Sequence, residues 1–231
     1  MLGELLTVEE IETSRSAPEL QVWIDLVLQR ALLPQHKETA LLRKKLAKEF
    51  YQEVYPLNFL IQHLFFNRED VICTPKIGSQ GYDAVLEISG KKKFDVEITF
   101  NHDGEKENLD MQYFIEHGKV SFTGKTERIK SDNGKSKIVN TSVAKYASEI
   151  KAEVYKFIKD ALKNKSKNRY GTGCLLIIAF EDHIGFRGDK DKNELLEFAD
   201  KELDCSSLEF EAIYLVGMSG KNIIPVKKLV V

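Results

Sequence analysis

The chain has 231 residues, of which 42% are hydrophobic and 30% are charged, and its formal net charge is −2. This composition is ordinary for a globular chain and excludes the low-complexity and disordered classes. No apolar run approaches the roughly 20 residues of a membrane span, and the segment MLGELLTVEE lacks the basic region and apolar core of a secretory signal. We therefore expect a cytoplasmic protein with no membrane partner. Its three cysteines are far apart in sequence and odd in number, which favours reduced core thiols.

Helical patterns fill the first part of the chain. Residues before Pro34 contain one or two amphipathic helices, with Ser16-Ala17-Pro18 as a start signal. Residues 36–66 are helical again, but Pro56 should break or kink this run and leave a shorter helix, PLNFLIQHLFF, before the first strand. We therefore expect an N-terminal helical region over residues 1–55 and an α/β domain over residues 56–231.

An acidic hairpin follows the first strand, VICTPK, and the loop GSQG. Residues two apart on a strand share a face, so the alternation in FDVEITF buries its apolar side chains and sends Asp95, Glu97 and Thr99 to the opposite face. In GYDAVLEI the same rule places Asp83 at the entry of the strand, on the outward face with Val85. The polar turn SGKKK joins the two strands.

The remaining elements alternate between helices and strands. A helix over residues 105–116 should end at Gly118 through a left-handed cap. Beyond it we expect two short strands over 119–123 and 125–130, followed by a polar loop over 131–137. A long amphipathic helix over 142–163 then leads to a strand over 173–180 that is buried on both faces. A helix over 193–203 and two further strands over 209–216 and 222–227 complete the order.

Charge is unevenly distributed along the chain. The segment 118–169 contains 14 Lys and Arg residues and 5 Asp and Glu residues, a net charge of +9, and the remainder carries −11. A basic segment in an acidic protein is typical of a phosphate-binding face, because contacts with the nucleic-acid backbone are mainly electrostatic. The alternative is that the lysines of 151–165 only solvate the outer face of a helix, and for that helix alone we favour the alternative.

The acidic hairpin is the candidate functional site. Asp83, Asp95 and Glu97 come to one place if the two strands pair, and clustered carboxylates repel one another unless a cation neutralises them. This arrangement favours a hard metal ion. The alternative is that the three acids line the solvent face of an ordinary hairpin and pair with the lysines of 91–93, as surface charges commonly do.

The order of elements around these acids resembles the core of the restriction-endonuclease-like, or PD-(D/E)xK, nuclease superfamily. The resemblance covers residues 56–180 by element order and residues 81–100 by motif. It implies a restriction-endonuclease-like α/β/α sandwich with a central mixed sheet and an N-terminal helical extension. It also implies that Asp83 and Glu97 bind Mg²⁺ or Mn²⁺, that the main-chain carbonyl of Ile98 completes the protein ligands, and that Asp95 permits a second metal ion or a more acidic first site.

Thr99 departs from the pattern of this superfamily. It stands where the family usually has a lysine, which is thought to orient the attacking water and to offset charge at the phosphorus atom. A threonine cannot supply a positive charge. Some members recruit a lysine from a neighbouring element, and this sequence offers Lys93, Lys145 and Lys151 as substitutes.

An assisting group is expected from the helix before the first strand, as in many members of the superfamily. The sequence offers Glu49, Glu53 and Gln62, and we rank Glu53 first because it lies just before Pro56. His102 follows Glu97 closely enough to approach the site as a general base, although an exposed turn histidine is the commoner role.

The function expected from these residues is metal-dependent hydrolysis of nucleic-acid phosphodiester bonds by an endonuclease of defence, restriction or repair. The expected partner is nucleic acid, with DNA favoured over RNA. A homodimer is one arrangement to consider, since many enzymes that cut both strands are dimers. Two alternatives stay open: a catalytically silent nucleic-acid-binding or scaffold protein of the same fold, and an α/β protein unrelated to nucleic acid.

Overall fold

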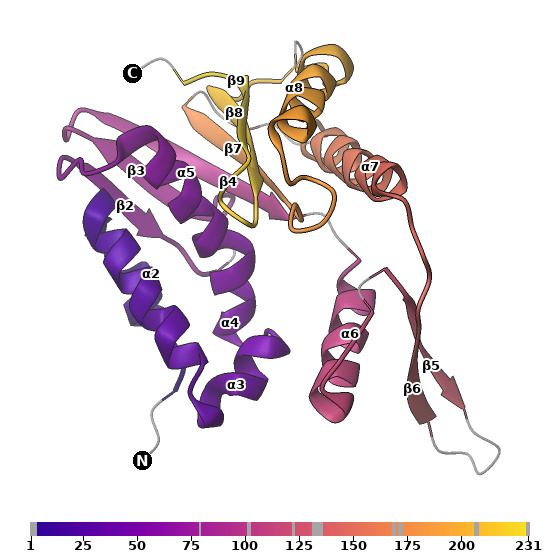
Figure 1. Ribbon diagram of the computed structural model, residues 1–231. Coiled ribbons are helices and arrows are strands. Elements are labelled where there is room, and N and C mark those ends of the chain that lie inside the picture. The colour runs from indigo at the N-terminus through magenta and orange to yellow at the C-terminus, as the bar shows by residue number, and fades with distance from the viewer. Residues whose placement is uncertain are drawn as a thin grey trace.

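A mixed sheet of seven strands forms the centre of the protein, in the order β1-β2-β3-β4-β7-β8-β9 (Figure 1). The computed structural model describes residues 4–78, 80–100, 103–121, 123–130, 136–167, 170, 173–205 and 208–229. The strands span Arg15–Ser16, Val71–Pro75, Ala84–Ile88, Lys92–Phe100, Cys174–Phe180, Ala212–Gly217 and Ile223–Lys227, in chain order. Strand β7 pairs in parallel with β4 and with β8, and the other neighbours are antiparallel. The expected mixed sheet and the acidic hairpin β3–β4 are confirmed.

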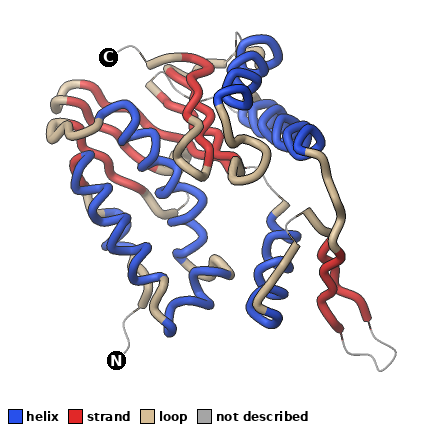
Figure 2. The backbone as a smooth tube through the Cα atoms, viewed as in Figure 1, coloured by secondary structure: helices blue, strands red, loops and turns tan. Residues whose placement is uncertain are grey.

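Helices cover both faces of this sheet (Figure 2). Helices α2 (Ala17–Ala31) and α5 (Tyr55–Phe65) pack on one face, and α7 (Ala147–Lys165) and α8 (Asp189–Glu202) pack on the other. Every residue of β7 is buried. Leu175 and Ile177 belong to the core beneath α2 and α5, and Leu176 and Ile178 to the core beneath α7 and α8. The continuous apolar run of β7 is therefore required by burial on both faces.

The N-terminal helices differ from the expected arrangement at Pro56. After α1 (Val8–Glu12), α2 and α3 (Pro34–Leu41), the chain turns at Arg43 and Lys45, whose φ angles are 45° and 52°. It then runs through α4 (Leu46–Glu49), a π-helical turn η1 (Phe50–Val54) and α5. The N–H of Tyr55 donates to the carbonyl of Phe50, and Pro56 lies in the first turn of α5, where its missing N–H costs little. The expected break is therefore a π-turn that continues into the next helix.

The segment between β4 and α7 lies outside the main sheet. It contains α6 (Gly104–His117) and an antiparallel ribbon of β5 (Lys125–Lys130) and β6 (Ser136–Thr141). Gly118 has a φ of 72° and ends α6 as expected. The strand expected at 119–123 is wrong, because β5 pairs instead with β6, which begins at the end of the expected loop.

A buried polar network ties α6 to this ribbon. Asp110, only 3% exposed, accepts hydrogen bonds from the hydroxyl of Thr126 and from Lys106 Nζ. The amide of Asn140 in turn donates to the Thr126 hydroxyl over 2.7 Å. A buried carboxylate of this kind is tolerated only because its oxygens are hydrogen-bonded.

The other elements follow the sequence with shifted ends. Helix α7 begins at Ala147 instead of residue 142, and α8 begins at Asp189 instead of residue 193. All three cysteines are free, and burial raises the pKa of Cys73 and of Cys174 to about 12. Among the described helices, none is both long enough and apolar enough to cross a membrane.

Replacement of Asp110 should loosen the ribbon. We expect Asp110→Ala to destabilise the protein by about 1–3 kcal/mol, because buried donors lose their acceptor. Thermal unfolding measures the total change, and hydrogen exchange over residues 125–141 measures where it falls. Asp160→Ala is the control, since Asp160 pairs with Lys156 at the surface over 3.6 Å. Equal effects of the two substitutions would contradict a structural role for the network.

Candidate functional site

Strand β4 separates its side chains as the alternation predicts. Phe94, Val96 and Ile98 are buried, and the acids point to the opposite face. This face is not uniform along the strand, because Asp95 is exposed whereas the side chain of Glu97 is only 12% exposed. Phe100, which alternation assigns to the buried face, is half-buried.

Val85 of β3 is buried, although a two-sided hairpin would send it to solvent. A sheet covered by helices on both faces leaves little open surface for an outward residue in its middle. The hairpin is therefore not an ordinary solvent-facing one at this end.

Asp83 is fixed against the middle of β4. Its main-chain N–H donates to the carbonyl of Val96 over 2.8 Å, and its carboxylate Oδ2 accepts from the N–H of Ile98 over 2.7 Å. Burial raises the pKa of Asp83 to about 6; the hydrogen bond from Ile98 and the charge of Lys165 oppose this increase, and the charge of Glu97 adds to it. The structure thus brings Asp83 and Glu97 together. The contact of Ile98 with Asp83 is through its N–H, and a metal-binding role for its carbonyl stays a prediction.

Glu53 approaches these two acids from the π-helical turn η1. Its pKa is raised to about 8, chiefly by burial and also by the negative charges of Asp83, Glu49 and Glu97, against a partial offset from Lys48. A π-turn rotates the following residues relative to a regular α-helix and often occurs at functional sites. The choice of Glu53 among the helical candidates therefore agrees with its position in the structure.

The other two helical candidates occupy different places. One oxygen of Glu49, Oε2, is buried and has no hydrogen-bond partner among the described residues. Gln62 lies elsewhere, where its amide donates to the carbonyl of Ala17 and to Asn58. Glu49 thus adds negative charge near Glu53, and Gln62 is structural.

Lys165 supplies the positive charge of the site. Its Nζ forms an ion pair and hydrogen bond with Glu97 Oε1, and its side chain is 20% exposed. Burial opposes the charged form, but the hydrogen bond and charge of Glu97, with smaller contributions from Tyr170 and Asp83, raise the pKa of Lys165. Lys165 is therefore a cation at neutral pH, held beside the acids by the last turn of α7.

The lysines proposed from the sequence are engaged elsewhere. Lys93 lies 3.6 Å from Glu87, and Lys145 pairs with Glu153. Lys151 pairs with Asp191 and with Glu194. The ion pairs of these three lysines are therefore formed away from Glu53, Asp83 and Glu97, which we call the acid cluster. The sequence contained a signal for Lys165, because this residue continues the buried stripe of α7 that contains Ile158, Ala161 and Leu162.

The remaining expected residues are less closely involved. Thr99 is half-buried on the same face as Glu97. Asp95 lies near the start of β4, where its N–H donates to the carbonyl of Gly173, and its charge contributes to raising the pKa of Cys174. His102 falls outside the described residues. The charges of Glu97 and Lys165 act on the pKa of Asp83, and the charges of Asp83 and Glu97 act on that of Glu53.

The chemistry of the cluster fits a hard divalent cation. Carboxylate oxygens are the ligands that Mg²⁺ prefers, and the pKa values of Glu53 and Asp83 are raised first by burial and then by neighbouring negative charge. Two of the acids are engaged by the protein itself, Asp83 by Ile98 and Glu97 by Lys165. Within the described part of the chain, no three His, Cys, Asp or Glu side chains are already grouped closely enough to hold a metal ion.

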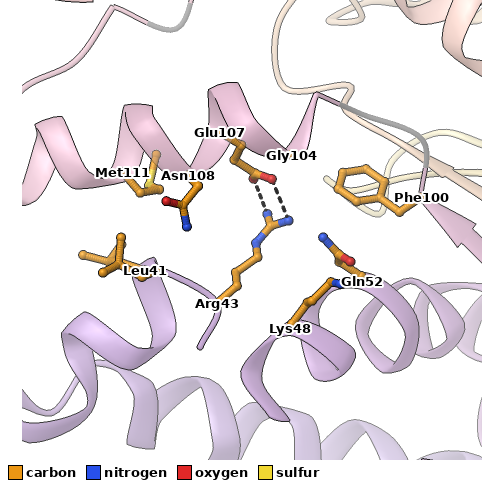
Figure 3. Close-up of a pocket in the computed structure, with 10 residues that line it drawn as sticks. Leu41, Arg43, Lys48, Gln52, Phe100, Gly104, Glu107, Asn108 and Met111 are labelled. Atoms are coloured by element: carbon orange, nitrogen blue, oxygen red, sulfur yellow. Dashed lines mark hydrogen bonds and ion pairs between the residues drawn. The ribbon is translucent and has the colours of Figure 1, made fainter. Parts of the chain in front are cut away.

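A cavity of about 380 Å³ is lined in part by η1 and β4, the elements that carry Glu53 and Glu97 (Figure 3). Gln52, the neighbour of Glu53, and Phe100, at the end of β4, both line it. It lies between the N-terminal helices and α6, where Arg43 and Glu107 meet across it in an ion pair of 2.6 Å. The carboxyl ends of parallel strands are the usual place for ligand sites in α/β sheets, and this end of β4 follows that rule.

Comparisons with protein-family models, curated proteins and solved structures gave no match. The functional assignment therefore depends on the geometry of the acids, Lys165 and the cavity.

The raised pKa of Glu53 predicts that the free energy of unfolding depends on pH. Between about pH 4.5 and pH 8 the folded state holds a proton that the unfolded state has released, so stability falls as pH rises through this interval. In a chelator, Glu53→Gln should stabilise the protein by about 1–2 kcal/mol at pH 8.5 after solvent screening, and by little at pH 5. Urea unfolding at both pH values measures this difference. Glu38→Gln, at an exposed site, is the control, and a gain that does not change with pH would contradict the assignment.

Proposed function

We propose that the protein is a metal-dependent nuclease of restriction-endonuclease-like fold that hydrolyses phosphodiester bonds of nucleic acid. The observation that carries this proposal is the convergence of Glu53, Asp83, Glu97 and Lys165 from η1, the entry of β3, β4 and the end of α7. The order of these elements supports the resemblance to the PD-(D/E)xK superfamily. We propose DNA as the favoured substrate and a role in defence, restriction or repair. A homodimer is the proposed arrangement if both strands of a duplex are cut.

Asp83 and Glu97 are the residues that would hold Mg²⁺ or Mn²⁺. Such an ion polarises the scissile phosphate and lowers the pKa of a bound water. The protein contributes a rigid position for Asp83 through the N–H of Ile98, and a half-buried environment that strengthens electrostatic interactions.

Lys165 takes the role that a lysine at position 99 has elsewhere in the superfamily. Its ammonium group lies beside Glu97 and brings a positive charge where Thr99 cannot. It therefore orients an attacking water and offsets negative charge on the phosphate. Glu53, with a pKa of about 8, is suited to accept or release a proton near neutral pH.

A silent nucleic-acid-binding or scaffold protein is the second candidate function. It is favoured by the ion pair of Lys165 with Glu97 and by the hydrogen bond from the N–H of Ile98 to Asp83, which each occupy one oxygen of these acids. An ion pair that replaces the metal would keep the fold and remove the chemistry.

Cleavage assays separate these two functions. We expect the wild type to cleave members of a panel of single- and double-stranded DNA and RNA with Mg²⁺ or Mn²⁺ and not with chelator. Asp83→Asn and Glu97→Gln should each lower the rate at least about 100-fold without loss of fold, because each removes a metal ligand. Asp160→Asn, an exposed acid purified in the same way, is the control. Absence of cleavage by the wild type, with metal binding unchanged in the variants, would favour the silent protein.

A lysine relocated to position 99 tests the role of Lys165. We expect Lys165→Met to lower the cleavage rate about 100-fold, since it removes the cation at Glu97. Thr99→Lys in the Lys165→Met background should recover part of that rate, because position 99 shares the face of Glu97. Lys163→Met, at an exposed position in the same helical turn, is the matched control. Full activity of Lys165→Met would exclude a catalytic role for this lysine.

A further inference from the structure

Two adjoining cavities form one cleft between the N-terminal helices and α6. Their volumes are about 380 Å³ and about 600 Å³, and both are lined by Leu41, Arg43, Glu107 and Met111. The smaller cavity is lined by Gln52, the chain neighbour of Glu53, and by Phe100, at the end of β4. The larger one continues along α2 as far as Leu28 and Leu32. The cleft therefore runs from residues of η1 and β4, the elements that carry Glu53 and Glu97, to the end of α2.

The lining combines cations with aromatic rings and amides. The guanidinium of Arg43 lies 5.9 Å from the ring centre of Tyr51 and 5.7 Å from that of Phe100. Lys48 lines the smaller cavity, and Lys37 lines the larger one. Basic side chains bind phosphates, and aromatic rings stack with bases.

Other groups of the lining also suit an anionic chain. Gln52 and Asn108 bring amides, and Gly104, the first residue of the 14-residue helix α6, places the amino end of that helix at the cavity wall. The acids of the lining are Glu107, which is engaged by Arg43, and Glu181, which lines the larger cavity.

The contact between Arg43 and Glu107 shows what Arg43 can bind. The two side chains meet through paired contacts, Nη1 to Oε2 over 3.0 Å and Nη2 to Oε1 over 2.6 Å (Figure 3). A guanidinium that grips a carboxylate with two parallel hydrogen bonds has the geometry that also grips a phosphate. A phosphate that binds Arg43 in this way would therefore compete with Glu107.

The size of the cleft selects the form of the nucleic acid. Cavities of about 300–1,000 Å³ enclose ligands of the size of one or two nucleotides. A duplex presents a major groove about 12 Å wide and has a far larger cross-section. The walls of this cleft are close enough for the side chains of Arg43 and Glu107 to touch.

From these observations we infer that the cleft binds a single unpaired nucleic-acid strand, with Arg43 on a phosphate, and leads that strand to Glu53, Asp83, Glu97 and Lys165. This inference rests on the proposed function and deepens it by naming the substrate class. DNA and RNA strands share the phosphate and base chemistry used here, so both are tested.

Binding without cleavage provides the test. The probes are fluorescein-labelled oligo-dT and oligo-U of about 15 nucleotides and a mixed-sequence DNA duplex of the same length, in chelator and at one salt concentration. Fluorescence anisotropy gives the dissociation constants. We expect at least one single strand to bind about tenfold or more tightly than the duplex.

Three substitutions locate the binding. Arg43→Gln should weaken binding of the single strand at least about tenfold. Glu107→Gln should strengthen it about threefold or more, because Arg43 loses its competing partner. Lys44→Gln removes the same charge from the next residue, whose Nζ pairs with exposed Glu38, and should change the dissociation constant less than about twofold.

Tighter binding of the duplex, equal effects of Arg43→Gln and Lys44→Gln, or weaker binding by a folded Glu107→Gln would each overturn the inference. Thermal unfolding checks each variant, and Glu107→Gln gives an independent result if Arg43→Gln does not fold. If strand binding depends on Arg43 but no substrate is cleaved, the cleft binds a strand and the proposed nuclease activity is wrong. If cleavage requires Asp83 and Glu97 but the KM of Arg43→Gln equals that of the wild type, the protein is a nuclease and the inferred strand binding by the cleft is wrong.

Discussion

Parallel pairing of β4 with β7 is the constraint on which the rest of the structure depends. Strand β7 is buried along its whole length, so both faces of the sheet need a helical layer. Parallel strands cannot be joined by a tight turn, and the connection must cross over the sheet. Here the crossover contains α6, the ribbon and α7. It returns Lys165 to Glu97 at one end, and at the other end it holds Glu107 against Arg43.

The negative charges of the acid cluster are only partly compensated by the protein. Glu97 has a cationic partner in Lys165, and Asp83 has a backbone donor in Ile98, but Glu53 has a pKa of about 8 because burial and neighbouring acids disfavour its charged form. A fold selected for stability alone would replace Glu53 with a neutral side chain. Strongly shifted carboxylates that converge from separate elements are typical of functional sites.

The cluster and the cleft are built on the same backbone. In η1, Glu53 interacts with the acids while its neighbour Gln52 lines the cleft. In β4, Glu97 is one of the acids while Phe100 lines the cleft. The elements that carry the acids therefore also supply part of the lining of the cleft. The unusual backbone nearby supports this shared geometry: η1 is a π-turn, and Arg43 has a positive φ.

The sequence alone determined most of the elements and the two faces of β4. Period-two alternation identified the buried face of β4 and the common side of Asp95 and Glu97, and the unbroken apolar run identified β7 as central. Only the tertiary structure decided which charges meet. Lys165 reaches Glu97 across 68 residues of chain, whereas Lys93, much closer in sequence, pairs with Glu87. Local periodicity reports which way a side chain points, but the partner it meets depends on the crossover that brings distant elements together, and no local pattern encodes that connection.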